Sequence, residues 1–246
     1  MAKLRLDKYL ADMQLGTRSE VKELIKKKHI KVNGTLICTP DFKLDTTTDT
    51  VTFDDRAVDY QEYEYFMLNK PGGVLSATRD QNTPTVLDLI TSKNRKDLFP
   101  VGRLDKDTEG LLLITNDGAL AHELLSPKKH VDKTYYAKVS GCIGTDIIAA
   151  FANGLKIDDE FTAMPAVLKV LAPPESTTPP DCFSEVLVTI REGKFHQIKR
   201  MFAAVGSEVL YLKRLSMGTL TLDTALKPGE YRTLTKAEIT ALQERN

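Results

Sequence analysis

Hydrophobic residues recur at helical spacing in the first 30 residues of the chain. The apolar positions of a first helix are Leu6, Tyr9, Leu10 and Met13. A second helix is predicted to begin at residues 17–20, Thr-Arg-Ser-Glu, which form a capping-box pattern. An extended segment then reverses at Asn33-Gly34, the dipeptide that favours a type I′ hairpin turn. The pattern predicts a small unit of two helices and a hairpin.

Alternating and continuous apolar segments predict a sheet with interspersed helices in the rest of the chain. Strands are expected at residues 50–53, 63–69, 111–114, 133–139, 161–171 and 182–190. Helices are expected at residues 83–90, 119–125, 146–155, 198–205 and after Thr235, where Glu238 completes a second capping box. Residues 173–180 contain four prolines and are predicted to form a surface loop. Residues 44–62 are acidic and rich in turns, which predicts a boundary near Tyr60, with domains at 1–60 and 61–246.

Composition supports a folded protein outside the membrane. The chain has 246 residues, of which 41% are hydrophobic, and this is enough for a substantial core. It contains no run of eighteen apolar residues, and its first ten residues carry charge and lack the apolar region of a signal peptide. We therefore expect a soluble, cytoplasmic protein with no membrane partner.

Cysteine and histidine spacing gives no sign of a metal centre or a disulfide framework. The three cysteines, Cys38, Cys142 and Cys182, are widely separated and form no Cys-x-x-Cys pair. The four histidines also lack the spacing of metal ligands. We expect single buried or solvated residues, no structural metal and no redox role.

Charge is sorted along the chain although its total cancels. There are 34 basic and 34 acidic residues overall, but residues 1–43 hold ten Lys or Arg against five Asp or Glu. Residues 44–60 hold one arginine against five aspartates. A neutral protein of this kind can still present a basic face to the phosphates of a nucleic acid.

Candidate chemistry centres on residues 101–118, VGRLDKDTEGLLLITNDG. In an extended segment Arg103 and Asp105 point to one side while Leu104 points into the protein, and a buried strand follows. By charge alone these could be ordinary loop residues. The order Gly-Arg-Leu-Asp, Asp-Thr-Glu-Gly and a run of leucines, however, resembles the catalytic motif of the RsuA-like pseudouridine synthases, which isomerise uridine in ribosomal RNA. The resemblance implies that Asp105 is the catalytic carboxylate.

The basic N-terminal segment, LRLDKYLADMQLGTRSEVKELIKKKHIKVNG, resembles the S4 RNA-binding domain. A lysine-rich helix by itself is usually only a solvated face. The resemblance, over about residues 3–50, implies that the phosphate-contacting side chains are Arg5, Lys8, Arg18, Ser19, Lys22 and Lys26. Phosphate contacts position an RNA without reading its sequence.

Three further segments match the family in order. Lys-Pro-Gly-Gly at residues 70–73 resembles its first motif, although a strand-to-turn junction would also explain it. The pattern Lys133-x-Tyr135 implies that Tyr135 stacks on the target base and is its proposed partner in proton transfer, while Tyr136 packs in the core. The segment EGKFHQIKRM, residues 192–201, resembles the third motif. There Ile198 would line the base pocket and Lys199 would pair with Asp105, whereas His196 is expected to be a turn residue or an RNA contact.

The reaction breaks the N1–C1′ bond, rotates the uracil and joins C5 to C1′. A nearby Lys199 would favour the ionised form of Asp105, which suits attack at C6, attack at C1′ or removal of a C2′ proton with a glycal intermediate. Arg103 could fill the place of the extruded base or bind a flanking phosphate. No cofactor is expected, because the reaction is redox-neutral and moves no external group.

The resemblance covers about residues 3–240. It implies an α+β fold with an S4 domain followed by a catalytic domain whose mainly antiparallel sheet is flanked by helices. The expected protein is a monomer that modifies small-subunit 16S ribosomal RNA, with uridine 516 as the target, within an assembling subunit. One alternative is the same chemistry on large-subunit 23S RNA. Another is a non-catalytic S4-type ribosome-assembly factor, which would have no need to keep Asp105, Tyr135 and Lys199 together.

Overall fold

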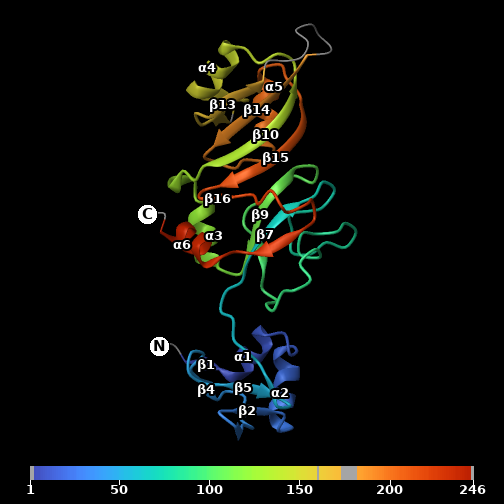
Figure 1. Ribbon diagram of the computed structural model, residues 1–246, viewed down its shortest axis with the longest axis vertical. Helices are drawn as coiled ribbons and strands as arrows, with labels where there is room; N and C mark the ends of the chain where they lie inside the picture. Colours follow the sequence, from blue (N-terminus) through green and yellow to red (C-terminus); the bar gives the residue numbers. More distant parts are fainter. Residues whose placement is uncertain (1–2, 160, 173–181, 245–246) are drawn as a thin grey trace. The chain divides into compact units, whose positions relative to one another are not determined.

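The computed structural model describes residues 3–159, 161–172 and 182–244. Contacts divide the chain into two compact units, and Figure 1 shows the elements of each. Unit 1 comprises residues 1–64 and 91–98, and unit 2 comprises residues 65–90 and 99–246. A short segment from the middle of the chain thus packs with the N-terminal unit: the Glu64 carboxylate accepts from the Asn94 and Arg95 backbone N–H groups, and Arg95 is buried.

Unit 1 has the predicted two helices and hairpin. Its helices are α1 (Leu6–Asp12) and α2 (Arg18–Lys26), and its strands are β1 (Leu4–Arg5), β2 (Ile30–Val32), β3 (Thr35–Leu36), β4 (Lys43–Leu44), β5 (Val51–Phe53) and β6 (Arg56–Ala57). The Thr17–Glu20 capping box is present at the start of α2. Asn33 and Gly34 both have positive φ between β2 and β3, as a type I′ turn requires. Local signals in the sequence therefore determine most of this unit.

Unit 2 is built on one large, mainly antiparallel sheet in the order β13-β14-β10-β15-β9-β7-β17. These strands are β7 (Tyr65–Lys70), β9 (Glu109–Thr115), β10 (Lys133–Ser140), β13 (Val167–Ala172), β14 (Phe183–Ile190), β15 (Val209–Met217) and β17 (Tyr231–Thr233). Short strands β8 (Phe99–Pro100) and β16 (Leu220–Thr221) pair with β9 and β15, and β11 (Leu155–Lys156) pairs with β12 (Thr162–Ala163). The pairing of β15 with β9 is parallel. The predicted α+β class and mainly antiparallel sheet are confirmed.

Helices cover the sheet at two places in Figure 1. They are α3 (Gly118–Leu125), the 3₁₀ helix η1 (Pro127–Lys129), α4 (Thr145–Asn153), α5 (Gln197–Ala204) and α6 (Lys236–Gln243). Phe151 of α4 and Phe202 of α5 are fully buried, with ring centroids 5.0 Å apart. Leu120 and Leu124 of α3 share a core with Leu242 of α6. Among the described helices, none is long and apolar enough to cross a membrane.

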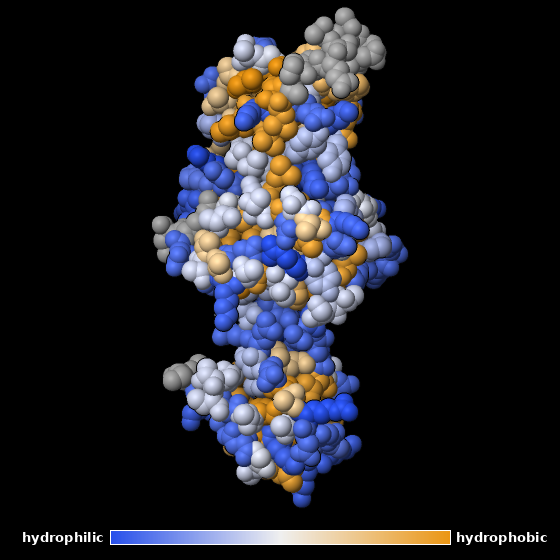
Figure 2. Space-filling view, viewed as in Figure 1, coloured by the Kyte–Doolittle hydropathy of each residue, from blue (hydrophilic) through white to orange (hydrophobic). Residues whose placement is uncertain are grey.

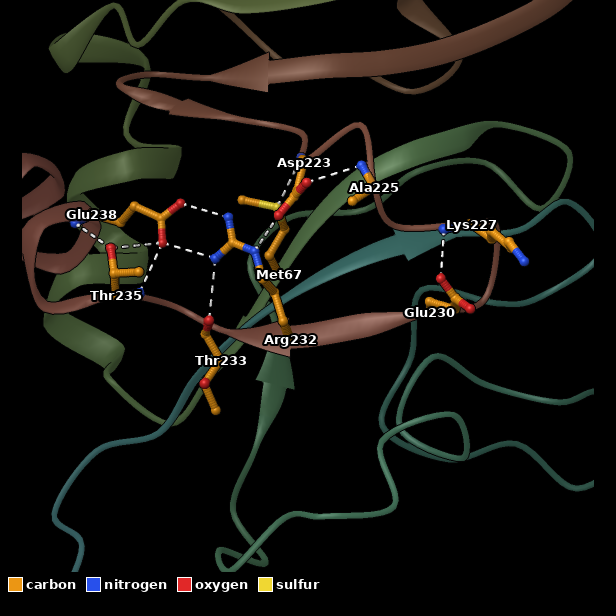
Figure 3. Close-up of polar contacts among 9 residues, drawn as sticks. All are labelled: Met67, Asp223, Ala225, Lys227, Glu230, Arg232, Thr233, Thr235 and Glu238. Carbon is orange, nitrogen blue, oxygen red and sulfur yellow. Dashed lines mark hydrogen bonds and ion pairs between the residues drawn. The ribbon is translucent and has the colours of Figure 1, made fainter.

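The end of the chain is fixed to the sheet by one charged cluster, drawn in Figure 3. Arg232 of β17 donates to Asp223 at 2.7 Å and to both carboxylate oxygens of Glu238 at 2.8 and 2.9 Å. Glu238 also completes the predicted capping box with Thr235 at the start of α6. The hydrogen bonds from Arg232 lower the pKa of Glu238 to about 2.

Two predictions from the sequence are wrong. Residues 83–90 form no helix: the Asp88 carboxylate accepts from the Thr85 N–H and hydroxyl, and Thr85 bridges Leu75, so the segment is a closed turn. Cys142 and Cys182 are joined by a disulfide, with Cα atoms 5.8 Å apart. The pairing of β10 with β14 aligns Ser140 with Phe183, which brings the two cysteines together from 40 residues apart. Spacing along the chain carries no information about this register.

Exposed apolar side chains gather at one end of unit 2. Orange surface is dense near the top of Figure 2, in the region of α4, β13 and β14. Val167 and Leu171 of β13 and Phe183 of β14 are exposed. This apolar area belongs to the outer strands, whereas the candidate site lies among the central ones.

Candidate active site

The loop before β9 holds Asp105 by the backbone of its neighbour. Leu104 is buried, and its N–H donates to Ser76 Oγ at 3.0 Å while its carbonyl accepts from the same hydroxyl at 2.9 Å. This double contact fixes the middle of Gly-Arg-Leu-Asp. Arg103 is exposed and Asp105 half-buried, so both side chains face away from the core, as the alternation predicted.

Lys70 anchors the other side of the same loop. Its side chain is fully buried, and its Nζ donates to the carbonyl oxygens of Pro71, Lys106 and Thr108 at 3.0, 3.1 and 2.8 Å. Burial lowers the pKa of Lys70 to about 8. Lys70 therefore holds the backbone of Lys106 and Thr108, the two residues on either side of Asp107.

The close approach of β9 and β15 explains why residue 110, at the end of Asp-Thr-Glu-Gly, is a glycine. Gly110 has φ +98°, and a Cβ at this position would lie 2.3 Å from the Arg214 carbonyl oxygen. Arg214 is buried in β15 and its Nε donates to the Leu111 carbonyl at 2.7 Å. Only glycine allows β9 to begin this close to β15, so the loop that carries Asp105 ends at a fixed point.

A small pocket of about 70 Å³ lies beside this loop. The side chains predicted to act at the site all line it, and they are Arg103, Asp105, Tyr135, Ile198 and Lys199. They come from the loop before β9, from β10 and from the first turn of α5. The sheet order places β10 two strands from β9, with β15 between them. Segments separated by up to 96 residues in the chain thus meet around one carboxylate.

The side chains of Lys199 and His196 approach Asp105, but neither is within hydrogen-bond distance of it. Lys199 Nζ lies 3.8 Å from one carboxylate oxygen and His196 Nε2 lies 3.6 Å from the other. Lys199 donates at 2.7 Å to both oxygens of Asp107, and this hydrogen bond lowers the pKa of Asp107. The predicted partner of Asp105 is thus at ion-pair distance from it but binds Asp107 more closely. The sequence indicated Asp107 only as a loop residue.

The two tyrosines of β10 lie on opposite faces. Tyr135 is buried and lines the pocket, with Val188 and Arg214 as its neighbours on the adjacent strands. Tyr136 is half-buried and packs edge-on against Tyr211, at a centroid distance of 6.0 Å. Strand alternation is the reason that only one of them reaches the pocket.

A rigid turn brings His196 to the site. Glu192 and Gln197 are both buried, and Gln197 Nε2 donates to Glu192 Oε1 at 2.8 Å. The Gln197 side-chain oxygen accepts from the Lys194 N–H at 3.0 Å, and Glu192 also accepts from the Met164 N–H at 2.8 Å. A turn at these residues was predicted from the sequence, but its distance from Asp105 was not, because that distance depends on where β14 ends.

The pocket opens onto a groove of about 1010 Å³ that also contains Arg103 and Asp105. Lys106, Lys133 and Lys194 line this groove. A half-buried carboxylate, a lysine shared with Asp107 and cations along the groove suit binding of an anionic substrate and general acid–base or nucleophilic chemistry. Within the described residues, no group of three or more His, Cys, Asp or Glu side chains is arranged to hold a metal ion.

Unit 1 presents its candidate phosphate contacts on the surface. The exposed side chains are Arg5, Lys8, Arg18, Ser19, Lys22 and Lys26. Two of them have acidic neighbours: Arg5 contacts Asp7 at 2.9 Å and Lys26 contacts Glu23 at 2.9 Å. All six lie on or next to α1 and α2.

Known proteins share both units. The model of a family described as RNA pseudouridylate synthase matches residues 64–204, and the S4 domain model matches residues 4–51. A Bacillus subtilis protein named uncharacterized RNA pseudouridine synthase YtzG is 47% identical over 242 residues, which cover 98% of this chain and 99% of that protein. The ribosomal small subunit pseudouridine synthase A of Escherichia coli K12 is 40% identical over 242 residues, covering 97% and 100%. A crystal structure of a pseudouridylate synthase aligns with a TM-score of 0.66 at 36% identity, covering 97% and 99%.

Proposed function

Because this chain belongs to the RNA pseudouridylate synthase family and carries an S4 domain, we propose that it converts one uridine of small-subunit ribosomal RNA to pseudouridine. The relatives named ribosomal small subunit pseudouridine synthase A support this substrate. The proposed target is uridine 516 of 16S RNA. The enzyme would act as a cytoplasmic monomer on an assembling subunit and need no cofactor.

Asp105 is the proposed catalytic residue. The observation that supports it most is the convergence of Arg103, Tyr135, Ile198 and Lys199 on the pocket that contains this carboxylate. Attack at C6, attack at C1′ and removal of the C2′ proton all require the carboxylate of Asp105, and Lys199 Nζ lies 3.8 Å from one of its oxygens.

The remaining pocket residues have proposed roles in holding the two fragments. After the N1–C1′ bond breaks, the freed uracil must turn so that C5 can join C1′, while C5 loses a proton and N1 gains one. Tyr135 is proposed to stack on the base and take part in this proton transfer, and Ile198 to contact its apolar edge. Arg103, which is exposed beside Asp105, is proposed to take the place of the extruded base in the RNA.

RNA binding is proposed to be divided between the two domains, residues 1–60 and 61–246. Six exposed side chains on or next to α1 and α2 would contact phosphates, and these are Arg5, Lys8, Arg18, Ser19, Lys22 and Lys26. Such contacts position RNA without reading its sequence, so the choice of uridine would fall to the catalytic domain.

The test is Asp105→Asn in the full chain, assayed on small-subunit ribosomal RNA. We expect the variant to bind this RNA as tightly as the unaltered protein and to form no pseudouridine, because the amide cannot act as a nucleophile or base. Asp159→Asn is the matched control, since Asp159 is an exposed aspartate paired with Lys156. Equal product from Asp105→Asn would contradict the assignment, and product on large-subunit RNA alone would overturn the substrate.

A further inference from the structure

Phe195 is the most exposed large apolar side chain in the part of the chain that the structure describes, with 71% of its surface open. Its ring stacks on His196, with centroids 3.7 Å apart and planes 20° apart. Single exposed apolar residues are ordinary on protein surfaces. The case for a function therefore depends on where this ring pair lies.

The pair lies on the groove that contains the proposed catalytic carboxylate. His196 Nε2 is 3.6 Å from an Asp105 oxygen, and both Phe195 and His196 line the groove of about 1010 Å³. The order from Asp105 outward is thus carboxylate, imidazole and phenyl ring. The rings therefore lie beside the carboxylate that the reacting nucleotide has to reach.

The backbone under the rings is preorganised. The buried pair of Glu192 and Gln197 fixes the turn through hydrogen bonds of 2.8 and 3.0 Å, the second of them to the Lys194 N–H. His196 has φ 49° and ψ 32°, a left-handed conformation that residues other than glycine seldom adopt. A strained backbone that persists next to a site is a reason to ask what it positions. Here it directs the imidazole toward Asp105 and leaves Phe195 exposed.

The size and charge of the groove point to its occupant. Its volume is at the upper end of the roughly 300–1,000 Å³ typical of sites for whole small molecules, so it has room for more than the single reacting base. Lys106 and Lys194 line the same groove with exposed side chains, which suit phosphates. A flat aromatic surface beside cations is the arrangement by which proteins bind single-stranded nucleic acid.

We propose that Phe195 and His196 form a stacking platform for the base that neighbours the target uridine in the RNA chain. The inference rests on the proposed function, because it assumes an RNA substrate with an extruded uridine. Extrusion disturbs the stacking of the bases on both sides of the uridine, and the exposed face of Phe195 offers a stacking surface to one of these two bases, while Arg103 takes the vacated place. Phe195 is thus a substrate-binding residue that the known motif pattern leaves unassigned.

The first test is the kinetics of pseudouridine formation on small-subunit ribosomal RNA by the full chain. Loss of one stacked base in Phe195→Ala should raise KM roughly 5- to 150-fold. It should leave kcat within about 2-fold, because stacking is equal in the ground and transition states. Phe195→Trp should restore KM and Phe195→Leu should not. Phe183→Ala is the matched control, because it removes an exposed ring at the end of β14 opposite to Ile190, which lines the pocket. It should change neither KM nor kcat.

The second test separates stacking from charge by measuring RNA affinity at several salt concentrations in the Asp105→Asn background. Adding Phe195→Ala should weaken binding without changing the salt dependence, since no phosphate contact is lost. Adding Lys194→Ala should instead reduce the slope of log affinity against log salt concentration by about 1.

Two results would overturn the platform: unchanged KM in Phe195→Ala, or full rescue by leucine, which would indicate apolar contact without stacking. Either can occur while the unaltered protein still forms pseudouridine, so the proposed function would survive. If the unaltered protein forms no pseudouridine, the proposed function fails. The effect of Phe195→Ala on RNA affinity then shows separately whether Phe195 stacks on the RNA.

Discussion

Two charged clusters of unit 2, one around Arg232 and one around Asp105, differ in how completely their groups are paired. Arg232 donates to Asp223, Glu238 and the Thr233 carbonyl at distances between 2.7 and 3.2 Å, and Glu238 also caps α6 (Figure 3). Asp105 has its cationic neighbours at 3.6 and 3.8 Å. The first cluster is saturated and joins β17 to α6, whereas the second leaves a carboxylate free to contact a substrate. Saturation suits stability, and incomplete pairing suits chemistry.

Apart from replacement of Asp105 itself, the largest effect should come from removing the cation shared by Asp105 and Asp107. Lys199→Met is expected to lower kcat for pseudouridine formation about 10²- to 10³-fold, the usual loss when one electrostatic group of a catalytic site is deleted. The thermal midpoint should change little, because the Lys199 side chain is partly exposed. Lys156→Met removes a 2.9 Å ion pair with Asp159 on the protein surface and serves as the control. Equal kcat in both variants would refute a role for Lys199.

The second prediction tests whether the hydrogen bonds of Lys70 hold the loop before β9, which carries Asp105. Lys70→Met leaves three carbonyl oxygens without their buried donor, which should lower the free energy of unfolding by roughly 2–4 kcal/mol. Urea denaturation followed by circular dichroism measures this directly. A variant as stable as the unaltered protein would show that the loop before β9 does not depend on Lys70.

The saturated cluster predicts a pH-dependent effect of smaller size. The pKa of Glu238 is about 2 in the folded protein and about 4.5 when unpaired, so its contribution is complete above about pH 4.5 and is lost as the pH falls toward 2. Glu238→Gln should lower stability by about 1–2 kcal/mol at pH 7, since the cluster is partly exposed. The difference in stability between the two proteins should be smaller at pH 3 than at pH 7 and should approach zero near pH 2. A constant difference at both pH values would contradict this assignment.

The smallest expected effect is the change in the salt dependence of RNA binding when the exposed Lys22 is replaced. Lys22 of α2 is exposed, and Lys22→Ala should reduce the slope of log affinity against log salt for ribosomal RNA by about 1. Lys156→Ala, in unit 2, should leave the slope unchanged. If Lys22→Ala also leaves it unchanged, α2 does not contact phosphate through this residue.

Local patterns predicted much of the fold. The Thr17–Glu20 and Thr235–Glu238 capping boxes and the Asn33-Gly34 turn are present because each depends on residues a few positions apart. The failures depend on distant partners. The Cys142–Cys182 disulfide follows from the register of β10 and β14, and the closed turn at residues 83–90 depends on a bridge to Leu75.

The same division applies to the site. The resemblance to the RsuA-like enzymes identified five residues that the fold brings to one pocket, and the family itself is confirmed by the two domain models. What the sequence missed is geometric: Lys199 binds Asp107 more closely than Asp105, and His196 comes within 3.6 Å of Asp105. Both distances are set by the position of α5 relative to the loop before β9, which no local pattern encodes.

The most direct test of the central claim is a map of pseudouridines in the ribosomal RNA of cells that contain or lack this protein. Loss of the protein should remove one pseudouridine from small-subunit RNA. Expression of the unaltered chain should restore it, and expression of Asp105→Asn at the same level should not. An unchanged map, or restoration by Asp105→Asn, would contradict the account.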